Sequence, residues 1–235
     1  MTDQIANASD QARDALVERL FRATIGTLEL FSVYLGWRVG LYTALRDGGP
    51  RTAGELAKQA GIDLRYAQEW LEQQAVAGLL QVAPGDDGEP ADRRRYLLPA
   101  GHADVLVDPT SLAHIAPFAP MVVGIGGALP EVAKAYRSGA GVPYADYGTD
   151  FQDGQGAINR PTFTHELAGW IAAMPDIHRR LSEQPPARVA DLGCGQGHST
   201  IALAKAYPDA QIVGLDLDPA SVADAIQLAA EQSAT

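Results

Sequence analysis

The chain has 235 residues, of which 46% are hydrophobic and 20% charged, and its formal net charge is −11. These proportions are typical of a folded globular protein and exclude an intrinsically disordered one. The acidic balance disfavours nucleic acid and anionic membranes as partners, because both repel a negatively charged protein. The single cysteine excludes an internal disulfide framework and a zinc site of several cysteines, which indicates a reducing compartment.

The N-terminus predicts neither a secretory signal nor a membrane anchor. It is polar and acidic, without the apolar core that a signal peptide needs. The longest apolar stretch, near residues 118–129, contains proline and glycine and is too short to span a bilayer. We therefore expect a cytoplasmic protein with no membrane association and no metal site.

A long amphipathic helix is predicted near the N-terminus, with Ser9 or Asp10 as its cap. Its apolar residues recur at helical spacing: Leu16, Leu20, Ile25, Leu28, Phe31, Tyr34 and Leu35. Such a helix needs another surface to cover it, either from its own domain or from a second copy of the protein.

The next segment has the element order of a winged helix. Thr52 and Glu55 form a capping-box pattern for a short helix that Gly61 ends. Asp63 then caps a helix over Leu64–Ala77. Strands over residues 79–82 and 95–98 follow, separated by a turn-rich run, and complete the two-stranded wing.

Winged helices often bind DNA, but the charges here disfavour that function. A DNA-reading helix presents basic and amide side chains on a positive face, whereas helix 64–77 has a net charge of −1. The one basic cluster is Arg93–Arg95 in the wing. We therefore expect a structural or dimerising domain, and we keep a DNA-binding regulator as the alternative.

Residues 111–185 are predicted to be a helical linker or substrate lid. Residues 111–137 are apolar and helical but interrupted by prolines, which predicts kinked helices that line a pocket or connect domains. Residues 144–159 are rich in Gly, Asp and Tyr and predict a long loop, after which Thr162 or Thr164 opens a helix. Pro185 and Pro186 mark the boundary before the last domain.

The most informative run begins at Val189. A short apolar strand, Val189–Leu192, leads into a glycine-rich loop with Gly193, Gly195 and Gly197, and a helix follows over residues 198–207. A second strand over residues 211–216 ends in Asp216, and Pro219 starts another helix. This order is half of a nucleotide-binding βαβ unit.

Each polar or glycine position in this run has a physical role. The glycines allow a sharp turn and the close approach of a ligand, and the helix N-terminus favours an electron-rich or carboxylate group. Asp216 ends the second strand, where a carboxylate can accept both hydroxyls of a ribose. Asp191 precedes the loop and could hold its amides or a cationic amino-acid portion of the ligand.

The spacing separates two classes of nucleotide site. A dinucleotide fingerprint needs its third glycine at position 198, which is His198, whereas glycine comes one residue earlier. The pattern D-x-G-x-G-x-G closely resembles motif I of class I methyltransferases that use S-adenosylmethionine (SAM). The segment from Leu215 to Pro219, with its carboxylate 19 residues after Gly197, resembles the acidic segment that follows it.

The resemblance extends to the N-terminal half and implies a function. A long helix and winged helix before motif I look like bacterial small-molecule O-methyltransferases, in which the N-terminal domain dimerises. It implies SAM as cofactor, a small-molecule methyl acceptor and a homodimer formed through the N-terminal helices. The residues that it implies for the cofactor site are Asp191, Gly193, Cys194, Gly195 and Gly197, Asp216 for ribose and Leu217 for adenine, with Tyr147 and Arg160 reaching over the cofactor's carboxylate.

The residues name no general base. Cys194 reads as a small filler, and His198 as a neighbour of the helix cap rather than a base. His165 and His178 lie in ordinary helical contexts. Catalytic residues therefore stay unassigned.

The predicted fold is α/β and mainly helical, with a winged-helix domain followed by the first half of a Rossmann-like SAM-binding domain. We expect domain limits of 1–110, 111–185 and 186–235. Since a complete domain of this class has seven strands, we expect a chain truncated at its C-terminal side, with doubtful activity of its own. The alternative function is a winged-helix regulator that keeps a SAM-like fold as sensor or relic.

Overall fold

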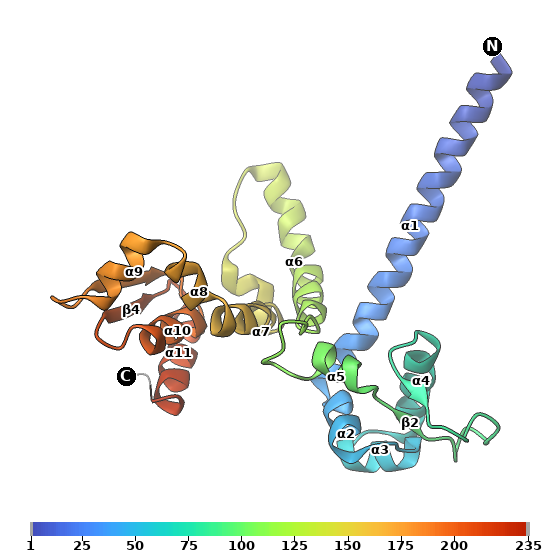
Figure 1. The fold of residues 1–235 in the computed structure, drawn as a ribbon. Helices are drawn as coiled ribbons and strands as arrows, with labels where there is room; N and C mark the ends of the chain where they lie inside the picture. Colours follow the sequence, from blue (N-terminus) through green and yellow to red (C-terminus); the bar gives the residue numbers. More distant parts are fainter. Residues whose placement is uncertain (1, 234–235) are drawn as a thin grey trace. The chain divides into compact units, whose positions relative to one another are not determined.

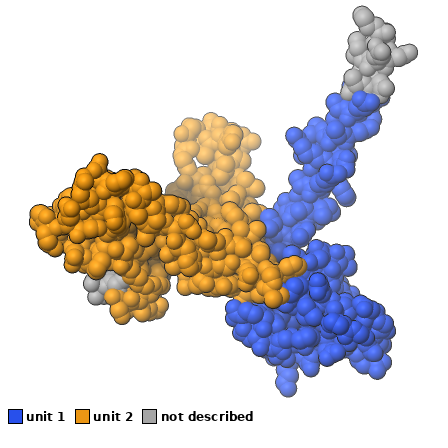
Figure 2. Space-filling model, viewed as in Figure 1, with its two compact units in different colours: residues 1–99 blue, residues 100–235 orange. Residues whose placement is uncertain are grey.

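Figure 1 shows the computed structural model, which describes residues 2–233. The chain divides into two compact units, residues 1–99 and residues 100–235 (Figure 2). None of the described helices is long and apolar enough to cross a membrane.

The first unit is a winged helix, as predicted. Its elements are α1 (Thr2–Arg38), α2 (Leu41–Gly48), α3 (Ala53–Ala60), α4 (Leu64–Val76), β1 (Gln81–Val82) and β2 (Tyr96–Leu97). The strands pair antiparallel, with Val82 opposite Tyr96. Thr52 and Glu55 form the expected capping box of α3, and Asp63 accepts the Arg65 amide at 2.9 Å to cap α4.

The predicted start of the long helix is wrong. Helix α1 begins at Thr2, and Ser9 and Asp10 lie inside it. The Asp10 carboxylate is used on the helix surface instead, where Arg13 donates to it at 2.9 Å. Since no proline or glycine stands between residues 2 and 10, nothing in the sequence stops the helix before its first residues.

The core of this unit gathers the apolar faces of α2, α3 and α4 against the wing. Its most deeply buried side chains include Leu41, Leu45, Leu56, Leu71, Leu80 and Tyr96. Among the side chains that the structure describes, those at the C-terminal part of α1 join this core. There the Ser32 carbonyl accepts a hydrogen bond from the indole N–H of Trp70 of α4 at 3.0 Å. Most of α1 runs free of the other elements of the unit (Figure 1).

A buried polar network fixes the angle at which α1 meets α2 and α4. Gln74 is fully buried and accepts a hydrogen bond from the Tyr42 hydroxyl through Oε1. Its amide nitrogen donates to Ser32 Oγ at 3.2 Å, and that hydroxyl donates to Gln73 Oε1 at 2.7 Å. Because a buried polar group without a partner costs free energy, these bonds favour one arrangement of the three helices.

Burial of Tyr42 predicts that this unit loses stability in alkali. Burial raises the pKa of the Tyr42 phenol well above its ordinary value, and the nearby Glu29 carboxylate adds to the rise. The unfolded chain ionises this tyrosine near pH 10 while the folded chain does not, so the stabilisation is complete below pH 10 and is lost as pH rises further. We expect the free energy of unfolding to fall by up to about 1.4 kcal/mol per pH unit above pH 10 from this group.

Urea unfolding at pH 9, 10 and 11 checks this prediction, with Tyr42→Phe as the test variant. The variant should show a flatter dependence on pH, whereas Tyr66→Phe, at an exposed position, should follow the parent protein. Equal slopes in all three proteins would contradict the assignment to Tyr42.

The arginines of the wing are engaged within the wing itself. Arg95 makes a two-pronged contact with Asp86, with distances of 2.8 and 3.0 Å, and these bonds lower the pKa of the Asp86 carboxyl. Arg94 donates to the Glu89 carbonyl at 3.0 Å, and Arg93 lies 3.8 Å from the Glu89 carboxylate. The acidic wing residues thus offset the positive charge that a phosphate contact would use.

The second unit begins with a helical segment and ends with a parallel strand pair. Its elements are α5 (Ala100–Leu106), α6 (Phe118–Ser138), the 3₁₀ turn η1 (Tyr144–Tyr147), α7 (Gly148–His165), α8 (Leu167–Ala172), α9 (Pro175–Ser182), β3 (Arg188–Leu192), α10 (His198–Ala206), β4 (Gln211–Leu215) and α11 (Pro219–Glu231).

Two predictions for the helical segment are wrong. Residues 144–159 form η1 and most of α7 rather than a long loop, and α7 runs through Thr162 and Thr164, which therefore start no helix. The cause is close packing of α7 on α6. A Cβ on Gly124 would lie 2.6 Å from Phe151 Cβ, and one on Gly154 would lie 2.7 Å from the Pro117 carbonyl. These glycines allow α6 and α7 to pack closely, although the glycine-rich composition of residues 144–159 is typical of a loop.

The strand pair β3–β4 is parallel, with Asp191 opposite Gly214. Helix α10 packs on the face that carries Gly214, since a Cβ there would lie 2.8 Å from Thr200 Oγ1. The opposite face is exposed along Leu192, Val213 and Leu215. Two parallel strands bury only one face in the described part of the chain, as expected for a sheet that needs helices on both sides.

Candidate cofactor-binding site

The glycine-rich loop follows β3 and turns directly into α10. The loop glycines have positive φ values, of 75° at Gly193, 52° at Gly195 and 80° at Gly197. Residues other than glycine rarely adopt this backbone conformation. Among the described residues, no atom lies within 4 Å of a Cβ added to Gly193 or Gly195. At Gly197 such an atom would lie 2.8 Å from Ala225 Cβ. Gly193 and Gly195 thus leave open space beside the backbone, whereas Gly197 allows α11 to approach.

Asp216, at the carboxyl end of β4, holds the loop. Its Oδ2 accepts a hydrogen bond from the Gly195 backbone N–H at 2.8 Å, and its Oδ1 accepts one from the Asp218 backbone N–H at 2.9 Å. Each carboxylate oxygen has capacity for a further donor, because an ionised carboxylate offers about four acceptor sites. Asp216 can therefore fix the loop and still accept hydroxyl groups of a ligand.

Asp191 accepts hydrogen bonds from α10, and of the two roles expected from the sequence only the hold on the loop amides is not seen. Its Oδ2 accepts the Ser199 hydroxyl at 2.6 Å and the Thr200 hydroxyl at 2.7 Å, both from the first turn of α10. No loop amide is among the hydrogen bonds found for it in the described residues, and Asp216 holds that amide instead. Asp191 thus ties β3 to the start of α10.

Cys194 is buried within the loop. Its Sγ would lie 2.9 Å from a Cβ on Gly214, so it fills the space between the loop and β4. Burial raises the pKa of the Cys194 thiol, and the carboxylates of Asp191 and Asp216 raise it further. A thiol kept protonated is a poor nucleophile, which agrees with a filler role.

His198 lies on the first turn of α10 and is partly covered. Burial lowers the pKa of its imidazole to about 4, and the positive charge of Arg160 adds to this effect. His198 is therefore neutral at physiological pH. His178 bonds the Tyr207 hydroxyl at 2.9 Å, and His165 bonds the Thr110 carbonyl at 2.9 Å, so both have structural partners.

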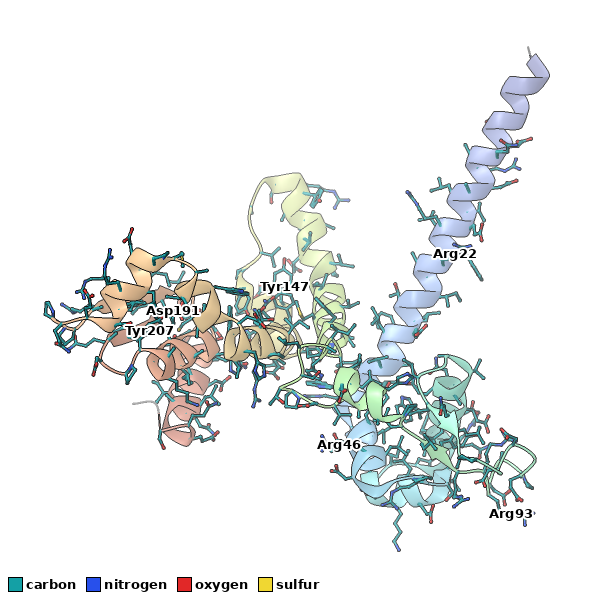
Figure 3. All side chains as sticks on the ribbon, in the orientation of Figure 1. Arg22, Arg46, Arg93, Tyr147, Asp191 and Tyr207 are labelled. Atoms are coloured by element: carbon teal, nitrogen blue, oxygen red, sulfur yellow. The ribbon has the colours of Figure 1, made fainter. Side chains whose placement is uncertain are left out.

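The two lid residues expected from the sequence lie at opposite ends of α7. Tyr147, labelled in Figure 3, precedes the helix. Its ring packs on Phe151 with centroids 5.1 Å apart. Arg160, near the other end, shares a pocket of about 310 Å³ with His198 and Gln196 of the loop. Leu217, expected to cover adenine, is fully exposed on the turn after Asp216.

Tyr144 is a site neighbour that the sequence analysis missed. Its ring packs edge-on against Phe151 at 5.8 Å. Burial raises the pKa of its phenol, and the carboxylates of Asp218 and Asp216 contribute, so Tyr144 lies near the end of β4. Only folding brings it there, because 72 residues separate Tyr144 from Asp216.

A groove of about 790 Å³ lies between α10, α11 and β4. Cys194 and Gly197 of the loop contribute to its lining, which otherwise consists mainly of small and aliphatic side chains. The polar groups that could orient a nucleotide gather at the loop and the end of β4, so we place the candidate site there. In the described residues, no cluster of His, Cys, Asp and Glu suited to a metal ion is present.

Two family models match the chain. The model described as "Methyltransferase domain" matches residues 184–235, and the one described as "Rv2258c-like winged HTH domain" matches residues 26–108. The first covers the glycine loop and Asp216, and the second covers the winged helix together with the C-terminal part of α1.

Curated relatives match a short segment of the chain. The trans-aconitate 2-methyltransferases of Methylobacterium nodulans and Streptomyces avermitilis are 50% and 48% identical over 50 and 52 residues. Each match covers 21% of this chain and 19% of the relative, so the chain matches about a fifth of their length.

Solved structures match nearly the whole chain. The mitomycin 7-O-methyltransferase MmcR is 22% identical with a TM-score of 0.63, over 95% of this chain and 64% of its own. Human N-acetylserotonin methyltransferase, solved in complex with SAM, is 18% identical with a TM-score of 0.61, over 90% and 62%. At these identities the likeness shows the fold, and this chain spans less than two thirds of either structure.

The two family models match the chain in the order of its structural features. The winged-helix model matches the N-terminal unit, and the methyltransferase model matches the segment with the glycine loop and Asp216. The chain therefore resembles methyltransferases that carry a winged helix–turn–helix domain ahead of the methyltransferase domain, with residues 26–108 matching the first and residues 184–235 the second.

Proposed function

We propose that this chain binds SAM at its glycine loop and takes part in methyl transfer to a small-molecule acceptor. The observation that carries the proposal is the Asp216 carboxylate, which holds the Gly195 amide at 2.8 Å at the end of β4 and retains acceptor capacity beside open space. A nucleoside ribose needs such a pair of acceptors at this edge of a sheet.

The proposed contacts follow from the positions of the groups. The methionine part of SAM lies along the loop residues Gly193, Cys194, Gly195 and Gly197. The first turn of α10, which follows this loop, offers backbone N–H groups to it. Asp216 accepts the ribose hydroxyls, and the exposed Leu217 packs on adenine. Asp191 supports this site through Ser199 and Thr200 of α10.

The lid residues are proposed for the carboxylate end of the cofactor. Arg160 supplies the positive charge for a carboxylate, and it lies beside the loop in the pocket with His198 and Gln196. Tyr147, fixed by its ring contact with Phe151, closes the other end of α7. We accordingly propose domain limits of 1–110, 111–185 and 186–235, with the middle segment as the lid.

The chemistry asks mainly for alignment. The acceptor atom attacks the methyl group of SAM in line with the departing sulfur, so the enzyme contributes chiefly proximity and orientation. A general base assists only when the acceptor is a hydroxyl. We propose a cytoplasmic enzyme.

Calorimetric titration of the full chain with S-adenosylhomocysteine tests the proposal, with NAD as the competing nucleotide. We expect micromolar binding of S-adenosylhomocysteine and no binding of NAD. Absence of heat with both, from a chain whose circular dichroism is that of a folded protein, would overturn the proposal.

We also propose that the N-terminal unit forms a homodimer through α1. This helix exposes a broad apolar face: Leu16, Val17, Leu20, Phe21, Ile25, Leu28 and Leu35. A face of this extent favours a protein partner. The engaged arginines of the wing support this role over DNA binding.

A double variant, Phe21→Glu with Leu28→Glu, should convert the dimer to a monomer in sedimentation equilibrium, because it buries two carboxylates in the proposed interface. Gly26→Glu is the matched control, since Gly26 has open space around it and lies on the opposite side of α1. A parent protein that sediments as a monomer at all concentrations would contradict the proposal.

A further inference from the structure

The glycine loop and the lid helix α7 meet in a close contact between Gln196 and Gly156. A Cβ on Gly156 would lie 1.9 Å from Gln196 Oε1 and 2.6 Å from Gln196 Cδ. The Gln196 side chain therefore rests on the α7 backbone at Gly156, a position without a side chain. Gln196 stands between Gly195 and Gly197, so a residue of the loop itself makes the contact.

The same glutamine also reaches α11. Its amide nitrogen donates to Asp224 Oδ2 at 3.3 Å, and the adjoining Gly197 packs against Ala225 of that helix. Gln196 is thus held between two helices that lie on either side of it. This solvent-exposed hydrogen bond favours the extended side chain that reaches Gly156.

The position of the contact along α7 has a consequence for Arg160. Residues four apart lie on the same face of a helix, one turn from each other. Gly156 and Arg160 therefore share a face, and Arg160 lies one turn beyond the contact, in the pocket with His198 and Gln196. A slide of α7 on the loop would move Arg160 by the same amount.

We infer that Gln196 is a positioning residue, and that its fit against Gly156 sets the register of α7 on the glycine loop and so places Arg160 beside the start of α10. The inference rests on the proposed function for its effect on cofactor affinity. The register itself does not depend on any ligand.

The test first introduces a steric clash at the contact between Gly156 and Gln196 and then removes it with a second substitution. Gly156→Leu puts a side chain where Gln196 lies, and leucine favours helix more than glycine does, so α7 itself is not weakened. Gln196→Ala in the same chain removes the obstructing side chain and restores the volume. Gly126→Leu on α6 is the matched control, because no described atom lies within 4 Å of its Cβ position.

The first readout is the titration of His198 by NMR in the chain without ligand. His198 shares its pocket with Arg160 of α7, Gln196 of the loop, and Asp224 and Glu231 of α11. In the parent it should stay neutral between pH 5 and 8, because burial and Arg160 lower its pKa to about 4. In Gly156→Leu, α7 is displaced, and we expect the pKa to rise by about one unit or more. The double variant should return it to the parent value.

The second readout is affinity for S-adenosylhomocysteine. We expect a loss of about tenfold or more in Gly156→Leu and recovery to within about threefold of the parent in the double variant. The control variant should match the parent in both readouts. Gln196→Ala alone should speed hydrogen exchange of α7 amides while leaving α6 unchanged.

The outcomes separate the two proposals. An unchanged His198 titration in Gly156→Leu, or a double variant that is no better than Gly156→Leu, would overturn the positioning role. Failure of the parent chain to bind S-adenosylhomocysteine would overturn the proposed function, and the His198 titration would still decide the role of Gln196.

Discussion

An Asp216→Ala substitution should weaken binding of S-adenosylhomocysteine by about 100-fold or more. The proposed ribose contacts are two hydrogen bonds to a charged carboxylate, each worth about 1.5–3 kcal/mol, and a loss of about 2.7 kcal/mol is already 100-fold. The variant also frees the Gly195 amide, which Asp216 holds at 2.8 Å, so the loop loses its fixed conformation. Calorimetric titration measures the change.

Asp209→Ala provides the matched control. This aspartate is an exposed carboxylate on the turn before β4, and it carries the same charge as Asp216 without contacting the loop. Its removal should leave the affinity within about twofold of the parent, because surface charges contribute little. A similar loss in both variants would point to general electrostatics and contradict the ribose role of Asp216.

A Gly197→Val substitution should destabilise the C-terminal unit by about 3 kcal/mol or more. Gly197 has a φ of 80°, and a Cβ there would lie 2.8 Å from Ala225 Cβ. The left-handed conformation alone costs a side chain about 1–2 kcal/mol, a β-branched residue tolerates it less well, and overpacking adds a further 1–3 kcal/mol. Hydrogen exchange of the β3 and β4 amides would report the loss within this unit.

Gly193→Ala separates strain from ligand contact. Gly193 has a similar φ of 75°, but no described atom lies within 4 Å of its Cβ position. This variant should lose only about 1–2 kcal/mol of stability, while the new methyl group occupies space proposed for the cofactor and lowers its affinity. Equal destabilisation by Gly193→Ala and Gly197→Val would show that contact with α11 contributes nothing.

The local elements with side-chain caps were predictable from sequence. Thr52 with Glu55, and Asp63 with the amide two residues later, act within four residues of the chain, so their hydrogen bonds depend little on the rest of the fold. The glycine loop was predictable for the same reason, because left-handed backbone at three alternating positions demands glycine wherever the chain goes.

The interval from Tyr144 to His165 shows why composition failed. Glycine is common both in loops and at close helix contacts, and only the presence of α6 beside α7 tells which applies. Likewise, the sequence allowed Asp191 to hold the loop amides, whereas the geometry gave the Gly195 amide to Asp216 and the α10 hydroxyls to Asp191. Two carboxylates at neighbouring strand ends are interchangeable until their distances to the donors are known.

The sequence by itself determined the winged helix, the order of β3, α10 and β4, the motif with its glycines, and the carboxylate that follows β4. The tertiary structure alone decided which helices touch the loop, which aspartate holds it, and that Gln196 rests on Gly156. The physical reason is range. Caps and left-handed turns depend on neighbours within a few residues, whereas the contact of Gln196 with α7 joins residues 40 positions apart, which only the packing of the folded chain brings together.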